Sequence, residues 1–529
     1  MTRRKMRQFI AMLFALCCAS AAPSQTTNSW ILNANSNWSE ISNWFPNTNY
    51  PDSVGAVAFI TNNISLNRIL TIDTNVTIGA LIWGDINRDR QMDLRTNAAG
   101  ARITFDTGDD GQMAVISHAS GDVAGRDIGN DSDDTDVGIT VADAQGLYID
   151  AFRNITFGGR TFQNAIFDGG GHDIVKGEDG TVLFQRIMTN VGTIYVRDGG
   201  FRVDPEGREE MKPDIGLVVL GVAPDVIDAG EMNPMGTLTN SNEASARDRR
   251  QFPIFEYIGA AATNTAVVMT NDFDMVINRG IFRSFNRPAW TNGAVPAVYT
   301  GTFTLNGDAN EVFFQIESDS SHTTNLVLPH IFAGTLTGSG GFSKWTHGEM
   351  VLANTNDFTG EVNVLRSNDR TRGTRGGLRL QDNGTMSGVS AISLQRDGEL
   401  FIDNSGLTLS NRINDAAPIT TWGRSQIEFV GNASSDTYER LGITTVTNGR
   451  LAIEFDSDDA SPRAHTLEFT SLNRARGTVV GFHASDVLQG AFASNGPGSI
   501  TLNLLDGGAW LEQIGSGGGV GATNRSVVV

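Results

Sequence analysis

The sequence has almost no cysteine. Its only two cysteines, Cys17 and Cys18, lie near the amino terminus. The residues after Cys18 therefore cannot form a disulfide, and they cannot supply a thiol nucleophile or a zinc-thiolate ligand. Any domain that they build must be held together by packing and by backbone hydrogen bonds.

Several catalytic motifs are also missing. There is no G-x-S-x-G elbow, no H-E-x-x-H pair and no phosphate-binding loop that ends in GK[ST]. The seven histidines are scattered, and none pairs with another at ligand spacing, so we expect most of them at surface and turn positions. Carboxylates are plentiful, but a glycosidase needs two of them at a set distance in a cleft. We therefore predict no catalytic residue, no cofactor, no metal site and no enzymatic activity.

Positive charge is scarce. The chain has 39 Lys and Arg residues against 59 Asp and Glu residues, for a formal net charge of −20. This balance favours solubility and argues against nucleic acids or anionic membranes as partners. Beyond residue 19 no apolar run reaches the roughly 20 residues that cross a bilayer as a helix. We expect no transmembrane segment in the mature chain, and an extracellular polysaccharide or another cell-surface component as the partner.

The first residues have the features of a signal peptide. A basic start at residues 3–7 precedes an apolar run at residues 9–19, and Ala19-Ser20-Ala21 forms an A-x-A cleavage site. We predict that residues 1–21 are removed and that the protein is secreted or displayed on the cell surface. Lipid attachment at Cys17 or Cys18 is the alternative. It is disfavoured because Leu16 and Cys17 precede them, where a small residue is expected.

Short apolar runs between Gly-rich turns fill most of the remaining sequence. Residues 338–380 contain the clearest set, with runs at 350–352, 362–365 and 378–380. A fainter copy lies at residues 173–203, where Lys176 and Gly180 have the spacing of Lys344 and Gly348. A unit of such short strands cannot bury its apolar face alone and must stack on its neighbours. Two copies in one chain therefore predict a solenoid.

The segment at 338–365 resembles the autotransporter-associated β-strand repeat. The residues that fit its pattern are Gly340, Gly341, Phe342, Lys344, Gly348, Leu352, Asn356, Phe358, Gly360, Val362 and Val364. Trp345 departs from it, because the family usually has a small residue there. The resemblance covers under a tenth of the chain. It implies a parallel β-helix exported as a stalk or passenger of a surface protein, with a purely structural repeat motif at Gly340, Gly341, Lys344, Gly348, Asn356 and Gly360.

We therefore predict an all-β fold, a right-handed parallel β-helix with an N-terminal cap and loop insertions. Residues 22–100 would form the cap and first rungs, 101–330 rungs with an insertion, 331–455 the helix with the repeat, and 456–529 further rungs. Residues 204–300 are the least regular and are expected to hold the insertion. A glycine-rich stretch at 514–521 leads to a strand start at 526–529 without closure, so we expect the chain to continue past Val529.

Three tryptophans mark the amino-terminal region. Trp30, Trp38 and Trp44 recur among Asn and Ser residues. Exposed indoles stack on sugar rings, so a carbohydrate-binding module is one interpretation. The favoured one is a cap that covers the open end of the solenoid, because an uncapped end would expose apolar side chains and unpaired strand groups.

Two acidic regions raise the question of a cation. Asp85, Asn87 and Asp89 have the D-x-N-x-D spacing of a calcium loop, but Arg90 replaces the turn glycine and Asn97 the bidentate Glu. A polar turn is favoured. The acidic residues within 106–136 are interpreted as solvated loops, the usual outcome for a run of like charges.

Arginines cluster after the repeat. They lie in one loop and the strand start that follows it: Arg366, Arg370, Arg372, Arg375 and Arg379. Such a cluster can contact an anionic polysaccharide. Local pairing with neighbouring carboxylates is favoured, because surface charges are usually only loosely paired or solvated.

The sequence thus favours an exported, non-enzymatic surface or passenger protein with a structural or adhesive role. The first alternative is a polysaccharide lyase or hydrolase built on a β-helix, with the acidic loops and the arginine cluster as its groove. The second is a carbohydrate-binding module. A fold alone confers no activity, so the enzyme is the weaker hypothesis.

Overall fold

The protein is described by a computed structural model. It describes residues 26–85, 90–96, 101–108, 111–118, 126–128, 137–151, 154–158, 166–177, 180–204, 213–221, 252–260, 269–287, 296–318, 329–365, 376–456, 463–484, 498–502 and 526–528.

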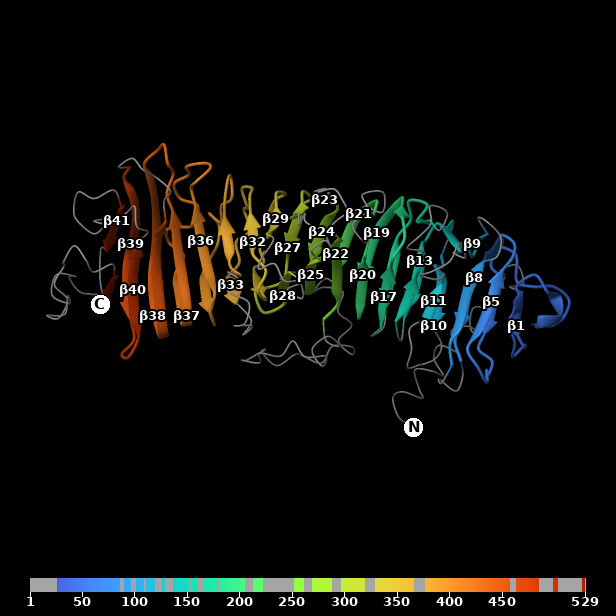
Figure 1. Cartoon of the computed structure of the whole chain (residues 1–529). Helices are drawn as coiled ribbons and strands as arrows, with labels where there is room; N and C mark the ends of the chain where they lie inside the picture. The colour runs from blue at the N-terminus through green and yellow to red at the C-terminus, as the bar shows by residue number, and fades with distance from the viewer. Residues whose placement is uncertain are drawn as a thin grey trace.

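The molecule is a long stack of short strands. Figure 1 shows the strands crossing the long axis one after another, with β1 at one end of the stack and β41 at the other. Among the described residues, the only regular element that is not a strand is a 3-10 turn at Ile41–Asn43. The predicted all-β fold is therefore confirmed.

Each rung of the stack passes through up to three strands, which lie on three faces. The first face is a single 12-stranded sheet. Its strands are β3 (Trp44–Phe45), β1 (Thr27–Trp30), β4 (Val57–Ile60), β7 (Ala80–Trp83), β10 (Ala114–His118), β13 (Leu147–Asp150), β16 (Ile174–Gly177), β19 (Val191–Val196), β21 (Ile215–Leu220), β24 (Asp274–Ile277), β27 (Phe303–Leu305) and β30 (Leu336–Thr337).

The second face follows the first in each rung that has a first-face strand. Its strands are β2 (Ser36–Asn37), β5 (Arg68–Ile72), β8 (Met92–Thr96), β11 (Arg126–Ile128), β14 (Ile155–Phe157), β17 (Thr181–Phe184), β20 (Gly200–Val203), β22 (Ile254–Ala260), β25 (Gly280–Arg287), β28 (Val312–Ser318), β31 (Phe342–Trp345), β33 (Val362–Leu365) and β35 (Ile392–Gln395).

The third face closes the rung. Its strands are β6 (Val76–Ile78), β9 (Arg102–Phe105), β12 (Gly138–Val141), β15 (Phe167–Asp168), β18 (Met188–Thr189), β23 (Met269–Asn271), β26 (Ala297–Tyr299), β29 (His330–Phe332), β32 (Met350–Leu352), β34 (Leu378–Leu380) and β36 (Glu399–Asp403). The stack then continues through β37 (Ile419–Val430), β38 (Thr437–Asp456), β39 (His465–Arg474), β40 (Val479–Ala484), β41 (Gly498–Leu502) and β42 (Ser526–Val528).

Successive rungs pair in parallel. Apart from β1 with β3 and β40 with β42, every pairing between the described strands is parallel. Each strand bonds to the strand of the same face one rung away, as β22 does to β25 from Ile254↔Ile281 onward. Strands joined by long connections and stacked in this way define the predicted parallel β-helix.

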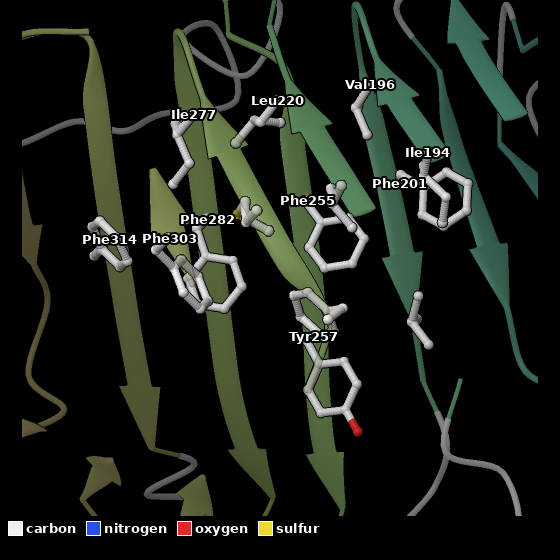
Figure 2. Close-up of a cluster of buried hydrophobic side chains, with 14 of the residues drawn as sticks. Ile194, Val196, Phe201, Leu220, Phe255, Tyr257, Ile277, Phe282, Phe303 and Phe314 are labelled. Atoms are coloured by element: carbon white, nitrogen blue, oxygen red, sulfur yellow. The ribbon is translucent and has the colours of Figure 1, made fainter. Parts of the chain in front are cut away.

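The core consists of columns of like side chains. Phe201, Phe255, Phe282 and Phe314 occupy matching positions on four consecutive strands of the second face, and Figure 2 shows them in one row. The ring centroids of Phe201 and Phe255 are 6.0 Å apart, and the rings are nearly parallel, at 11°. Burial of each ring contributes roughly 1.5–3 kcal/mol. Stability is thus distributed over the rungs instead of resting in one central core.

Near the carboxy-terminal end, the second and third faces share continuous strands. β37 pairs with β35 through its first residues and with β36 through its last. The strand turns the corner at Gly423, and β38 does so one rung later at Gly449, with φ values of 86° and 80°. Only glycine adopts this backbone region readily. Paired glycines at the corner therefore allow two strands to merge into one bent strand.

Residues 204–300, which were expected to hold some rungs and a longer insertion, contain regular rungs. β21 to β26 continue the three faces between residues 215 and 299. The intervening segments 222–251, 261–268 and 288–295 lie outside the described residues. Within the part of the chain that the structure describes, no helix is long and apolar enough to cross a membrane.

Candidate functional site

The three amino-terminal tryptophans form a buried cap. Trp30, Trp38 and Trp44 are 2%, 0% and 0% exposed. The ring of Trp44 meets that of Trp30 at 5.2 Å and that of Trp38 at 4.9 Å, both edge to face. The indole N–H of Trp38 donates to the Pro51 carbonyl at 3.0 Å, and that of Trp44 to the Trp38 carbonyl at 2.8 Å. Their faces are covered by protein, so they offer no platform for a sugar.

The calcium-like motif is only partly described. Asp85 is buried, and its carboxylate accepts the backbone N–H groups of Ile64 and Arg90, each at 3.2 Å. Asn87 and Asp89 lie outside the described residues. Asp85 thus holds two chain segments together. Among the described residues, which include only parts of 106–136, no group of three or more His, Cys, Asp or Glu side chains is placed to hold a metal.

The repeat lysine points into the core. Lys344 lies in register with Phe314 on one side and Val364 on the other, within an inward-facing column, and is 0% exposed. Its ammonium group donates to the carbonyl of Thr346 at 2.8 Å and to that of Gly376 at 3.0 Å. These acceptors lie at the corner between the second and third faces, in two successive rungs. Charged donors make stronger hydrogen bonds than neutral ones, so the lysine ties the corner together.

The fainter copy of the repeat has the same construction. Lys176 is also 0% exposed and lies in register between Ile149 and Val196. Its ammonium group donates to the carbonyl of Gly177 at 2.6 Å and to that of Asp198 at 3.1 Å, again in two successive rungs. However, Lys176 lies in a strand of the first face, whereas Lys344 lies in one of the second. The two copies are therefore displaced by one face around the helix.

The repeat asparagine joins three rungs. Asn356 is 1% exposed, and its side-chain oxygen accepts the backbone N–H of Leu336 at 2.8 Å. Its amide donates to the Asn354 carbonyl at 2.7 Å and to the Thr385 carbonyl at 3.0 Å. Leu336 belongs to the first face, which ends at β30, so Asn356 continues its hydrogen bonding beyond the last strand of that sheet.

The repeat glycines mark places where backbones of neighbouring rungs touch. Gly341 donates its N–H to the Gly307 carbonyl at 3.0 Å, and Gly360 donates to the Gly340 carbonyl at 2.9 Å. A Cβ atom on Gly340, Gly341 or Gly360 would overlap backbone atoms of the adjacent rung, and one on Gly348 would lie 2.7 Å from the Ile316 carbonyl oxygen. The motif is therefore structural at each of its positions.

Three of the seven histidines do not lie at the surface or turn positions expected for most of them. His118, His330 and His465 are 2%, 0% and 1% exposed, so these three are interior residues. His330 shows why burial is tolerated. Its Nε2–H donates to the carbonyl of Glu317 at 3.1 Å, and its Nδ1 accepts from the Ser284 hydroxyl at 2.6 Å. Burial lowers the pKa of His330 to about 3, which keeps the ring neutral.

This Ser–His contact is enclosed. The Tyr299 hydroxyl hydrogen-bonds to Ser284, and Tyr299, Ser284 and His330 are all 0% exposed. The donors thus run from Tyr299 through Ser284 and His330 to a backbone carbonyl. A nucleophile must reach its substrate, and this hydroxyl lies inside the solenoid. The chain of hydrogen bonds satisfies polar groups in the core.

Of the arginine cluster, only Arg379 lies among the described residues. Arg379 lies between Glu349 and Asp403, with charged atoms 2.7 Å apart on both sides, and its guanidinium covers the Phe401 ring at 4.4 Å. The favoured interpretation, local pairing, therefore holds for Arg379. Arg366, Arg370, Arg372 and Arg375 lie outside the described residues.

A polar groove lies on the outer surface where β37 and β38 turn the corner. It encloses a volume of about 180 Å³. It is lined by residues of the β35–β36 turn and of three strands: Asp397, Glu399, Arg424, Ser425, Gln426, Arg450 and Ala452. β36, β37 and β38 are neighbours in the orange part of Figure 1. We call this site the corner groove.

Charge in the corner groove is arranged by strand register. Arg424 and Arg450 are partners on adjacent strands. The Arg424 guanidinium pairs with the Asp397 carboxylate through contacts of 2.7 Å and 3.3 Å. The amide of Gln426 donates to Glu428 and to Glu454, both at 3.0 Å, and so holds these two carboxylates in place. The groove lining therefore combines two arginines with the carboxylates of Asp397 and Glu399.

A third repeat in the sequence marks this groove. Residues 423–429 read GRSQIEF, and residues 449–455 read GRLAIEF. Each glycine, arginine, isoleucine, glutamate and phenylalanine of one copy is in register with its counterpart in the other. The sequence analysis looked for catalytic and metal-binding motifs and did not predict the groove. The recurrence of five identical residues at the same spacing could have indicated it.

The fold and its surface thus define a parallel β-helix with a structural repeat and an outer polar groove. No protein-family model, no curated protein and no solved structure matches the chain.

Proposed function

We propose that this protein is an exported, non-enzymatic β-helix that acts as a structural or adhesive element at the cell surface. The observation that carries the proposal is the use made of the repeat residues. Lys344 and Asn356 are buried, and every hydrogen bond seen at their side chains ties one rung to another or closes a corner. Such residues favour a long, rigid stalk over a chemical site.

The interior supports the same proposal. Arg412 is 0% exposed and donates to the backbone carbonyls of Asp382, Gly384 and Leu407 at 2.7–2.9 Å. The hydroxyl of Ser284 and the ring of His330 are likewise engaged inside the core. Polar groups that would serve chemistry on a surface serve stability here.

Export is supported by the sequence. The basic start, the apolar run at 9–19 and the A-x-A site at 19–21 are those of a cleaved signal peptide. The resemblance of residues 338–365 to the autotransporter-associated repeat points in the same direction. An acidic surface with a net charge of −20 suits a protein that remains soluble outside the cell.

Fractionation of the producing cell tests the proposal. The expected result is a chain that starts after Ala21 by amino-terminal sequencing and is removed from intact cells by added protease. Retention of the full amino terminus in the cytoplasm would refute export. The purified chain is then incubated with neutral and acidic polysaccharides, and new reducing or unsaturated ends are measured. The appearance of such ends would refute the structural role and favour a carbohydrate-active enzyme.

A further inference from the structure

We propose that the corner groove binds a carboxylated sugar, one hexuronate unit of an acidic polysaccharide, through Arg424 and Arg450. This inference goes beyond the structural role proposed above. The groove lies on the outside of β36 to β38, away from the columns that hold the fold, so the binding site and the stalk are separable by mutation.

The first argument is that one of two neighbouring arginines has no partner among the described residues. Arg424 and Arg450 are in register, and adjacent strands lie only about 4.8 Å apart. Asp397 pairs with Arg424. Within the described part of the chain, Arg450 has no ion-pair or hydrogen-bond partner. Like charges directly opposite each other on a sheet are unfavourable. An anion held between the two guanidinium groups removes that repulsion, and Arg favours planar, bidentate carboxylates.

The second argument is shape. The glycine corners at Gly423 and Gly449 fold β37 and β38 so that Arg424 and Arg450 stand at the bend. Ala452 occupies the position next to Gln426, where a small side chain leaves space. The groove has a volume of about 180 Å³. This space suits one sugar ring of an extended chain that passes over the surface.

The third argument is the mixture of charges. A site built for bare phosphate would present donors alone, whereas this groove also contains Asp397 and Glu399. Carboxylates accept hydrogen bonds from hydroxyl groups. A ligand that carries several hydroxyls and one carboxylate matches both halves of the lining. A hexuronate has this chemistry, a neutral hexose lacks the carboxylate, and phosphate lacks the hydroxyl groups of a sugar.

The test is isothermal titration of the intact mature chain with a galacturonate trisaccharide. A neutral glucose trisaccharide and inorganic phosphate serve as comparison ligands. The expected result is saturable binding of the uronate alone. Arg450→Ala is expected to weaken it at least tenfold, and Arg424→Ala similarly. Arg440→Ala is the matched control, because Arg440 is 39% exposed and pairs with Glu468 away from the groove. That control is expected to change affinity less than twofold.

The outcomes separate clearly. Equal binding of phosphate would reduce the site to a general anion site and overturn the proposal. Equal binding of the neutral trisaccharide would exclude a role for the carboxylate, and no binding would exclude the site. Circular dichroism of the Arg450→Ala chain is expected to match the wild type, because Arg450 is exposed. Failure of uronate binding with an unchanged spectrum and surface location would leave the structural role standing.

Discussion

The Nζ atom of Lys344 lies 3.0 Å from the carbonyl oxygen of Gly376, a residue one rung further along the helix. The same lysine also reaches Thr346 at 2.8 Å, within its own rung. A buried cation thus closes a corner that the backbone alone leaves open. Lys176 does the same one face away, with Gly177 and Asp198. The chain contains only four lysines in all, at positions 5, 176, 212 and 344.

Replacement of Lys344 by Met keeps most of the apolar stem and removes the ammonium group. Two carbonyl oxygens then lose a charged donor, which is expected to cost about 2–3 kcal/mol. The measurement is urea denaturation followed by far-UV circular dichroism, with hydrogen exchange of the neighbouring rungs to locate the loss. Arg440→Met, on the surface, is the control and should change stability by less than about 0.5 kcal/mol. Equal effects of both substitutions would contradict a corner role for Lys344.

Asn356→Leu is expected to open the stack where the first face ends. Leucine fills a similar volume but leaves the Leu336 N–H and the carbonyls of Asn354 and Thr385 without this side chain. The expected loss is about 3 kcal/mol, since each buried group left unsatisfied costs about 1–3 kcal/mol. Hydrogen exchange should show faster exchange of the Leu336 amide. An unchanged exchange rate of the Leu336 amide would mean that Asn356 does not stabilise this end of the first face.

Gly360→Ala tests the contact between rungs. The new methyl group would overlap the backbone of Gly340 and Gly341. The expected result is a loss of more than about 3 kcal/mol, or failure to fold, because backbone atoms cannot move aside as a side chain can. Gly138→Ala is the matched control. Its Cβ would lie 3.4 Å from the flexible Arg102 side chain and 3.6 Å from the Ala101 carbonyl, which are ordinary contacts. Equal stability of both variants would disprove the close approach.

Glu439 makes stability depend on pH. It is 0% exposed and accepts the backbone N–H groups of Arg412 and Ile413, both at 3.0 Å. Burial raises its pKa from 4.5 to about 7. The carboxyl group therefore contributes stability fully below about pH 4.5, and that contribution is lost as the pH rises through about 7. A shift of this size corresponds to on the order of 3 kcal/mol.

The measurement compares wild type with Glu439→Gln by urea denaturation at pH 4.5, 6 and 8. The variant cannot ionise, so the wild type should lose stability relative to it as the pH rises. His330 works in the opposite direction, because its pKa is lowered to about 3 and its contribution is lost as the pH falls below about 6.5. Both proteins share His330, so it cancels in the difference. If the difference in unfolding free energy between the two proteins is the same at all three pH values, Glu439 does not cause the pH dependence.

Much of the fold could be predicted from the sequence, because each rung of a β-helix is formed by consecutive short strands and turns. The runs at 350–352, 362–365 and 378–380 are strands with those same bounds. Turn residues limit these three strands, and the side chains at their first and third positions are apolar and buried. The cap of Trp30, Trp38 and Trp44 could also be predicted from the sequence, since an open solenoid end must be covered.

The corner groove was not predicted, because it arises from register and not from a motif. Residues 443–446 and 451–455 look like two separate strands, yet both belong to β38. The intervening Gly449, with φ of 80°, lets the chain turn without leaving the sheet. The register that places Arg450 opposite Arg424 follows only once β37 and β38 are known to pair. The burial of His330 likewise depends on Ser284, which lies 46 residues away in sequence.

The orientation of the backbone hydrogen bonds has a mechanical consequence. In this stack the strands cross the long axis, so the bonds between β22 and β25, or between β37 and β38, point along it. A pull from end to end would stretch all the bonds between two rungs at once. A pull on one loop would break the hydrogen bonds between two rungs one after another. The molecule should therefore bear tension along its length far better than peeling from its side.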